Sequence, residues 1–269
     1  MIRRKVDGFK LYLNPPDGGI SGELAKKRRR EPAFMWLLRK EAHGIAFDIG
    51  GNIGYTTLHL SQKCDKVYAW EPDKRSYKVL ARNTQDLKNV VISRNAISDK
   101  IEERKIYLSK KPNLTTLCKG QPGIGKSKII SCSTIEQFCI DNKTAPDFIK
   151  MDIEGAEIAA IRGGIEVLKD KPCKILMELH PQYYNKAEAI VVFNLLLKYG
   201  YKFKYLINAK GKSYKFKALE MVPIKKFDDC MRYVYEGNPE HEDHYLDWAI
   251  NLDTDKKKIV RAVMLEKNG

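Results

Sequence analysis

The stretch Ile45-Ala46-Phe47-Asp48-Ile49-Gly50-Gly51-Asn52-Ile53-Gly54 contains a short apolar run that leads into a cluster of glycines. Residues 45–49 predict a buried β-strand, because a short apolar run that ends at turn residues is typical of strands. The glycines allow the backbone to approach a ligand closely, and the helix expected at 55–62 offers free N–H groups at its N-terminus. The stretch therefore predicts a strand, a ligand-binding loop and a helix, in that order.

The sequence on the C-terminal side repeats this alternation of strand-like and helix-like segments. It predicts strands at 67–71, 90–96, 148–153 and 174–179, and helices at 76–87 and 187–199. An irregular insert rich in Lys, Pro and Gly occupies 109–128, and the chain beyond residue 200 is expected to be antiparallel β. The pattern predicts a doubly wound α/β fold with a mostly parallel, Rossmann-like sheet and an antiparallel C-terminal portion.

The composition is that of a soluble globular protein and excludes a disordered or fibrous one. Of 269 residues, 43% are hydrophobic, and 49 Lys and Arg exceed 34 Asp and Glu by 15 charges. This excess predicts a surface that attracts phosphates, nucleic acid or an anionic membrane face. No apolar run approaches the ~18 residues of a spanning helix, and no signal peptide is evident, so we expect a cytoplasmic protein. The six cysteines form no C-x-x-C pair and are expected to be free thiols.

Three regions differ in charge. Residues 1–44 include Lys26-Lys27-Arg28-Arg29-Arg30 and are expected to form a basic appendage. Residues 45–235 are expected to form the α/β domain, and 236–269 a charged C-terminal tail.

Two acidic residues are placed to bind a ligand at the carboxyl ends of the first two strands. Asp48 precedes the glycines at 50, 51 and 54, which do not have the G-x-G-x-x-G spacing of a dinucleotide fingerprint. Glu71 ends the second strand, where an acidic side chain can accept hydrogen bonds from two ribose hydroxyls. A nucleoside with a cationic arm would satisfy both carboxylates.

Four motifs together resemble the FkbM-type family of class I S-adenosylmethionine-dependent methyltransferases. They are Phe47 to Gly54, Glu71-Pro72 with Asn83 downstream, Asn95-Ala96-Ile97-Ser98-Asp99, and Ile149-Lys150-Met151-Asp152-Ile153-Glu154-Gly155-Ala156-Glu157. The upstream segments Asp17-Gly18-Gly19-Ile20 and Arg30-Glu31-Pro32 are similar to the family's lead-in. Gly51 stands where the family more often carries alanine.

The resemblance implies that S-adenosylmethionine is the cofactor and assigns residues to it. Asp48, Gly50, Gly51, Asn52 and Gly54 would hold the methionine part. Glu71, with Pro72 beside it, would bind the ribose, and Asn95 and Ala96 would border the adenine. Asp152 would face the methyl group and the acceptor. The acceptor implied by the family is a hydroxyl of a sugar, a glycolipid or a small natural product.

Methyl transfer to a hydroxyl requires alignment of the acceptor and removal of its proton. The candidate bases are Asp152, Glu178 and His180. Glu178 and His180 lie two residues apart on a strand and are expected to point the same way, and the usual pKa of histidine suits a base near neutrality.

Three other features of the sequence indicate different functions. Gly120-Gln121-Pro122-Gly123-Ile124-Gly125-Lys126-Ser127 matches the phosphate-binding pattern G-x-x-x-x-G-K-[ST], which predicts a P-loop nucleotide hydrolase, although a strand-like run follows where a helix is required. Tyr201, Phe203 and Tyr205, which alternate with lysines, could belong to an RNA methyltransferase or nucleic-acid-binding surface, or to an ordinary strand. His241-Glu242-Asp243-His244 lacks the H-E-x-x-H spacing, so no metal is assigned.

Overall fold

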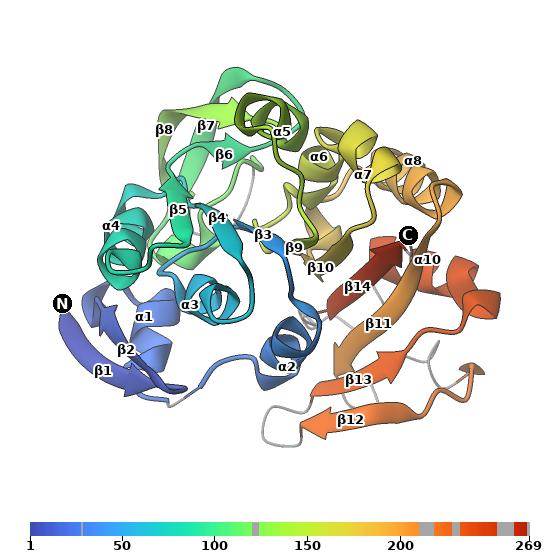
Figure 1. The fold of residues 1–269 in the computed structure, drawn as a ribbon, viewed down its shortest axis with the longest axis horizontal. Helices are drawn as coiled ribbons and strands as arrows, with labels where there is room; N and C mark the ends of the chain where they lie inside the picture. The colour runs from blue at the N-terminus through green and yellow to red at the C-terminus, as the bar shows by residue number, and fades with distance from the viewer. Residues whose placement is uncertain (28, 120–123, 210–217, 228–231, 252–260, 268–269) are drawn as a thin grey trace.

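The computed structural model describes residues 1–27, 29–119, 124–209, 218–227, 232–251 and 261–267. A nine-stranded sheet runs through the molecule in the order β12-β13-β11-β14-β10-β9-β3-β4-β5, with helices on both faces (Figure 1). Its five parallel strands are β3 (Ile45–Ile49), β4 (Lys66–Trp70), β5 (Val90–Ser93), β9 (Phe148–Met151) and β10 (Lys174–Leu179). The predicted α/β fold with a mostly parallel sheet is confirmed, and β3 and β10 have the predicted bounds.

The other half of the sheet is antiparallel, as predicted for the chain beyond residue 200. It contains β11 (Tyr201–Ala209), β12 (Pro223–Phe227), β13 (Arg232–Glu236) and β14 (Arg261–Lys267). β14 comes from the segment that the sequence analysis set apart as a charged tail, and it lies between β10 and β11 inside the sheet. The proposed boundaries at residues 44 and 235 stay a prediction, but part of this tail belongs to the central sheet.

Alternation along the strands divides the buried apolar side chains into two cores. On β3, Phe47 and Ile49 face one core, and Ala46 faces the other. The first core is covered by α5 (Ile135–Asn142), α6 (Glu157–Arg162), α7 (Ile165–Asp170), α8 (Lys186–Lys198) and α10 (Glu242–Ile250). The second core is covered by α2 (Pro32–Glu41), α3 (Tyr55–Ser61) and α4 (Lys74–Thr84).

The N-terminal region packs against the second core. It consists of the hairpin β1 (Ile2–Val6) and β2 (Phe9–Leu13) and the short helix α1 (Gly19–Leu24), followed by α2. Asn83 of α4 connects the hairpin to the glycine loop, because its amide oxygen accepts from Tyr12 N at 2.6 Å and its amide nitrogen donates to Ile53 O at 2.7 Å. The hairpin is therefore attached to the loop that the sequence analysis singled out.

A second, three-stranded sheet flanks the expected irregular insert and includes its two ends, Ser109 and residues 124–128. β6 (Ala96–Ile97), β7 (Glu102–Ser109) and β8 (Ile124–Ser133) form it in the order β6-β8-β7. The expected strand 90–96 therefore ends at Ser93, and Ala96 pairs in this second sheet. Gly125, Lys126 and Ser127 lie in β8, and 120–123 of the candidate P-loop lie outside the described residues. The P-loop hypothesis fails on this point, because its Lys and Ser must begin a helix.

Within the described part of the chain, no helix combines the length and apolar character needed to cross a membrane. The cysteines at 64, 118, 132, 139 and 173 are free, as expected, and Cys230 lies outside the described residues.

Candidate functional site

One cavity opens where the parallel strands β3, β4, β9 and β10 end. This is the edge at which open α/β sheets bind ligands. The residues after these strands meet there with residues from the N-terminal region and from the second sheet. The lining is Ile20, Arg30, Ile49, Gly50, Asn52, Trp70, Glu71, Pro72, Ala96, Ile97, Ile106, Pro112, Asn113, Thr115, Thr116, Leu117, Asp152, Ile153, Glu154, Ala156 and Glu178.

The glycine loop, residues 50–54, forms one wall of this cavity. Gly50 has a φ of +86°, and a Cβ placed on it would overlap the backbone oxygen of Asp152. Gly50 N and Gly51 N both donate to Trp70 O, at 3.0 and 2.9 Å. A Cβ on Gly51 would lie 3.3 Å from Thr57 Oγ1, a tight but not prohibitive contact, so alanine nearly fits there. Glycine is required at position 50, where the ends of β3 and β9 approach each other most closely.

Glu71 lies at the end of β4 and faces the cavity. Its two carboxylate oxygens accept from Asn52 N at 2.9 Å and Asp73 N at 2.8 Å. Burial raises the pKa of Glu71 to about 8, although both backbone donors oppose this shift. The two hydrogen bonds fix the carboxylate in place beside the glycine loop, where a ribose can reach it.

Asp48 lies beneath the glycine loop and does not line the cavity. It is fully buried, with Oδ1 3.1 Å from Lys150 Nζ and Oδ2 accepting from the hydroxyls of Thr56 at 2.9 Å and Thr57 at 2.7 Å. Lys150 Nζ also donates to Gly50 O at 2.6 Å. The Asp48–Lys150 pair therefore supports the loop from below.

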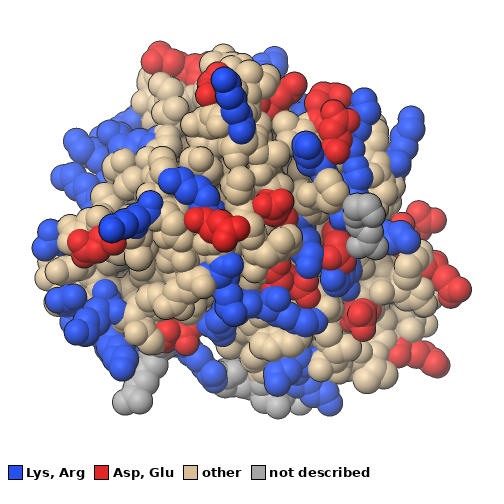
Figure 2. Space-filling model, in the orientation of Figure 1, with Lys and Arg blue, Asp and Glu red and all other residues tan. Residues whose placement is uncertain are grey.

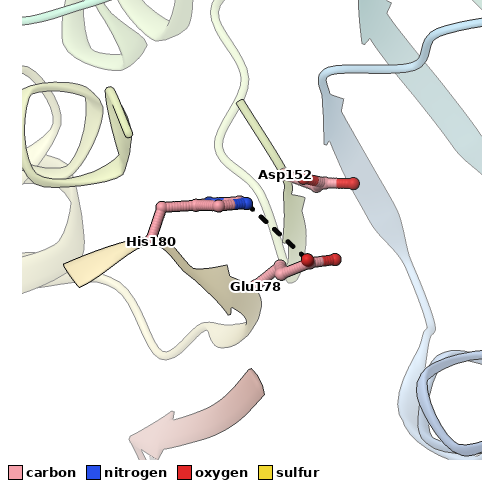
Figure 3. Close-up of side chains that lie close together, drawn as sticks. All are labelled: Asp152, Glu178 and His180. Carbon is pink, nitrogen blue, oxygen red and sulfur yellow. Dashed lines mark ion pairs between the residues drawn. The ribbon is translucent and has the colours of Figure 1, made fainter. Parts of the chain in front are cut away.

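Asp152, Glu178 and His180 lie close together and form what we call the acidic cluster (Figure 3), of which Asp152 and Glu178 line the cavity. One ligating atom of each lies within 4.8 Å of the others. His180 Nε2 is 3.6 Å from Glu178 Oε1 and 3.5 Å from Glu154 Oε2. Burial, and then the charges of Asp152 and Glu31, raise the pKa of Glu178 well above its usual value. The cluster concentrates negative charge next to the cavity.

His180 differs from the expectation of a base with a near-neutral pKa. Burial alone would lower its pKa, but the charge of Glu157, the hydrogen bond to it, and the charges of Glu178 and Asp152 raise it well above its usual value. Nδ1 lies 2.9 Å from Glu157 Oε1. These contacts do not support His180 as a proton acceptor with a near-neutral pKa.

The predicted site residues fall into two groups. Gly50, Asn52, Glu71, Pro72, Ala96, Asp152 and Glu178 line the cavity. The other predicted residues do not line the cavity. The side chain of Asn95 is exposed, and His180 lies behind Glu178. The remaining three, Gly51, Gly54 and Asp48, support the loop.

Several lining residues were not assigned a role from the sequence. Arg30 forms ion pairs with Glu31 and with Glu23, the latter at 3.2 Å. In the sequence, the segment Arg30-Glu31-Pro32 only resembled the family's lead-in, and no role was predicted for Arg30. Thr115 and Thr116 come from the insert, whose composition indicated only a loop. Asn52 and Glu154 have φ values of 48° and 54°, so two non-glycine residues at the cavity have left-handed backbone conformations, which are frequent at functional sites.

A comparison with protein families identifies the domain. The Methyltransferase FkbM domain matches residues 48–203, more than half of the chain. The chain belongs to the FkbM methyltransferase family. The FkbM domain is an S-adenosylmethionine-dependent methyltransferase domain, so the family, the enzyme class and the cofactor expected from the sequence are confirmed.

Solved structures of methyltransferases resemble the FkbM chain at low identity. A methyltransferase FkbM from Methylobacillus flagellatus is 17% identical with a TM-score of 0.44, and the match covers 73% of this chain and 44% of that chain. A putative methyltransferase from Streptococcus mutans, in complex with S-adenosylhomocysteine, is 11% identical with a TM-score of 0.44 and coverages of 89% and 99%. An rRNA methylase from Streptococcus thermophilus is 10% identical with a TM-score of 0.41 and coverages of 89% and 98%. No curated protein matches the chain.

Proposed function

We propose that this protein transfers the methyl group of S-adenosylmethionine to a hydroxyl oxygen of a sugar, a glycolipid or a small natural product. The observation that carries the proposal is that the glycine loop, Glu71, Asp152 and Glu178 border one cavity. The cofactor and the acceptor would therefore meet inside it. A cytoplasmic location stays a prediction.

The cofactor is expected along the wall formed by β3, β4 and the second sheet. Gly50 and Asn52 would contact the methionine part, and Glu71 would accept hydrogen bonds from the ribose hydroxyls. Ala96 and Ile97, both buried and lining the cavity, would border the adenine. Asp48 would act indirectly, through Lys150 and the carbonyl of Gly50.

The acidic cluster is expected to receive the acceptor. S-adenosylmethionine supplies an activated methyl group, and the sulfur keeps the electron pair of the bond that breaks. The acceptor oxygen forms the new bond to carbon, and its proton passes to a carboxylate. Asp152 is the strongest candidate, since it lines the cavity and its carboxylate forms no hydrogen bond or ion pair with the described residues.

A groove next to the cavity supports an acceptor that also carries negative charge. It shares Ile20, Arg30 and Asn113 with the cavity and is lined by Lys26, Lys27 and Lys111. A phosphate on the acceptor would be attracted to these lysines while its hydroxyl reached Asp152. Phosphorylated sugars are therefore the first acceptors to test.

The nucleic-acid alternative is weakened by the placement of its aromatic residues. Tyr201, Phe203 and Tyr205 are all buried in the cores and are not available to stack on bases. On the face shown in Figure 2, Lys and Arg side chains are spread out and interrupted by acidic ones. RNA is retained as a test substrate only.

Calorimetric titration with S-adenosylhomocysteine tests the cofactor assignment. At pH 9, where Glu71 is ionised, we expect binding by wild type and at least about tenfold weaker binding by Glu71→Gln, because hydrogen bonds to a charged group are worth roughly 1.5–3 kcal/mol. Glu41→Gln is the matched control, since Glu41 is also buried but pairs with Lys174 at 2.7 Å, away from the cavity. Equal affinity of wild type and Glu71→Gln would contradict the ribose assignment.

Transfer of a radiolabelled methyl group tests the acceptor class. Neutral sugars, phosphorylated sugars, amines and RNA are offered in parallel, and the product is treated with mild alkali. We expect an alkali-stable ether from a sugar, whereas an alkali-labile ester, a methylated amine or a ribonuclease-sensitive product would overturn hydroxyl methylation of a small acceptor.

A further inference from the structure

The acidic cluster brings together three side chains of the kinds that bind divalent cations. Asp152 follows β9, and Glu178 and His180 lie at the end of β10 (Figure 3). Their nearest ligating atoms lie within 4.8 Å of one another. Two ligands on opposite sides of a small divalent ion lie about 4.2 Å apart, so slight side-chain adjustment brings all three into contact with one ion.

His180 is oriented as a metal ligand would be. Glu157 is fully buried and accepts from Ile153 N at 3.1 Å and Gly155 N at 3.0 Å, which fixes its carboxylate. Its contact with Nδ1 of His180 directs Nε2 toward Glu178 and Glu154. A carboxylate that holds the second ring nitrogen is the usual support of a metal-binding histidine.

The carboxylates of the cluster have too few cationic partners. Glu178 is 8% exposed and His180 is 6% exposed, yet the Glu178 carboxylate forms just one ion pair with the described residues, to His180 at 3.6 Å. Arg30 and Lys150 also attract these carboxylates, but both form their ion pairs with other residues. Arg30 pairs with Glu31 and Glu23, and Lys150 pairs with Asp48. A buried carboxylate that accepts no hydrogen bond and faces the cavity indicates a missing cationic ligand.

We propose that Asp152, Glu178 and His180 bind one divalent cation at the acceptor side of the cavity. Two carboxylate oxygens and one imidazole nitrogen suit Mn²⁺ or Zn²⁺ better than an all-oxygen ion such as Ca²⁺. No metal is expected from the sequence, because the one local motif of ligand-type residues, at 241–244, lacks the spacing of a metal site. This cluster joins residues from two strands, which spacing does not reveal.

The role of the ion rests on the proposed function. Bound to the cluster, it would hold the acceptor hydroxyl and make loss of its proton easier. Asp152 has two carboxylate oxygens, so one can bind the ion while the other accepts the proton. An acceptor with two neighbouring hydroxyls, as in a sugar, could bind the ion through both.

Titration of the full chain with Mn²⁺, followed by electron paramagnetic resonance, tests the site. We expect one ion per chain and at least tenfold weaker binding by Asp152→Asn and by Glu178→Gln. Asp86→Asn, which changes an exposed carboxylate, should bind like wild type. Coupling of the bound ion to an imidazole nitrogen should be present in wild type and absent in His180→Gln.

S-adenosylhomocysteine titration of the same proteins separates the two proposals. Variants that bind it as wild type does are folded, so loss of Mn²⁺ in them assigns the ligands. If wild type binds S-adenosylhomocysteine but no Mn²⁺ or Zn²⁺ up to about 1 mM, or binds them unchanged in Asp152→Asn and Glu178→Gln, the cation site is wrong and the negative charge faces a cationic group of cofactor or acceptor. Failure of wild type to bind S-adenosylhomocysteine would count against the proposed function alone.

Discussion

The two sides of the cavity are built on opposite principles. On the cofactor side, the glycine loop and Glu71 are fixed by backbone hydrogen bonds, and the buried charge of Asp48 is matched by Lys150. On the acceptor side, Asp152 and Glu178 have few partners among the described residues, and the carboxylates repel one another. The charge of Asp48 on the cofactor side is thus matched by a cation, whereas the carboxylates on the acceptor side lie close together despite their mutual repulsion.

The largest effect is expected from Gly50→Ala on the cofactor side. A Cβ there would overlap the backbone of Asp152 at a φ of +86°, so we expect a loss of about 3 kcal/mol in unfolding free energy and no measurable S-adenosylhomocysteine binding. Gly200→Ala is the matched control. Gly200 has a φ of +89° with nothing within 4 Å, so this variant should lose only about 1 kcal/mol and bind normally. Chemical denaturation measures the unfolding free energy, and calorimetry measures binding. Equal losses of stability in the two variants would show that the backbone of Asp152 does not require glycine at position 50.

Asp48→Asn is expected to destabilise the protein by about 3 kcal/mol, because it leaves the buried ammonium of Lys150 without its carboxylate. Affinity for S-adenosylhomocysteine should change less, since Asp48 does not line the cavity. The double variant Asp48→Asn/Lys150→Met, compared with the two single variants by urea denaturation, should recover part of the loss. A double variant whose loss is the sum of the single losses would show that the pair is not coupled.

These two predictions also show where the sequence was informative. Local patterns placed β3, the glycine loop and Glu71, because strand ends and loop glycines are adjacent in the chain. They could not pair Asp48 with Lys150 or Glu157 with His180, because those contacts join segments far apart in the sequence. β14 was not predicted, because charged residues surround it in the sequence. Its apolar run from Ala262 to Leu265 is nevertheless typical of a buried strand. Arg30 and Thr115 reach the cavity only through long-range packing.

The pH dependence of cofactor binding is expected to depend on Glu71. Its pKa of about 8 is raised by burial, so the neutral acid contributes stability that is fully present below the unfolded pKa and is lost as pH rises through about 8. Ribose hydroxyls donate to the ionised form. We therefore expect S-adenosylhomocysteine affinity to increase about tenfold between pH 7 and pH 9. Glu71→Gln should remove this increase, and calorimetry at pH 7, 8 and 9 measures it; an identical slope in the variant would assign the titration to another group.

On the acceptor side, Asp152→Asn should change folding stability little. Asp152 repels Glu178 and Glu154 but attracts Arg30, Lys150 and His180, and these effects oppose each other, so the unfolding free energy at pH 7 in the presence of a chelator should change by no more than about 1 kcal/mol. Methyl transfer should fall sharply in the same variant. Asp86→Asn should change neither stability nor activity, and a loss of about 3 kcal/mol in Asp152→Asn, as large as that expected for Asp48→Asn, would contradict the contrast between the two sides.

The smallest effect is expected from Asn95→Ala, which separates a residue implied by family resemblance from its neighbours at the cavity. The side chain of Asn95 is exposed, whereas Ala96 and Ile97 are buried and line the cavity. Removal of an exposed side chain usually changes a free energy by no more than about 0.5 kcal/mol, so S-adenosylhomocysteine affinity should change less than about twofold. Ile97→Ala should weaken binding several-fold in protein that remains folded. If Asn95→Ala has the larger effect, the adenine lies outside the cavity, beside the segment that follows β5. The adenine contacts would then have to be assigned to residues of that segment.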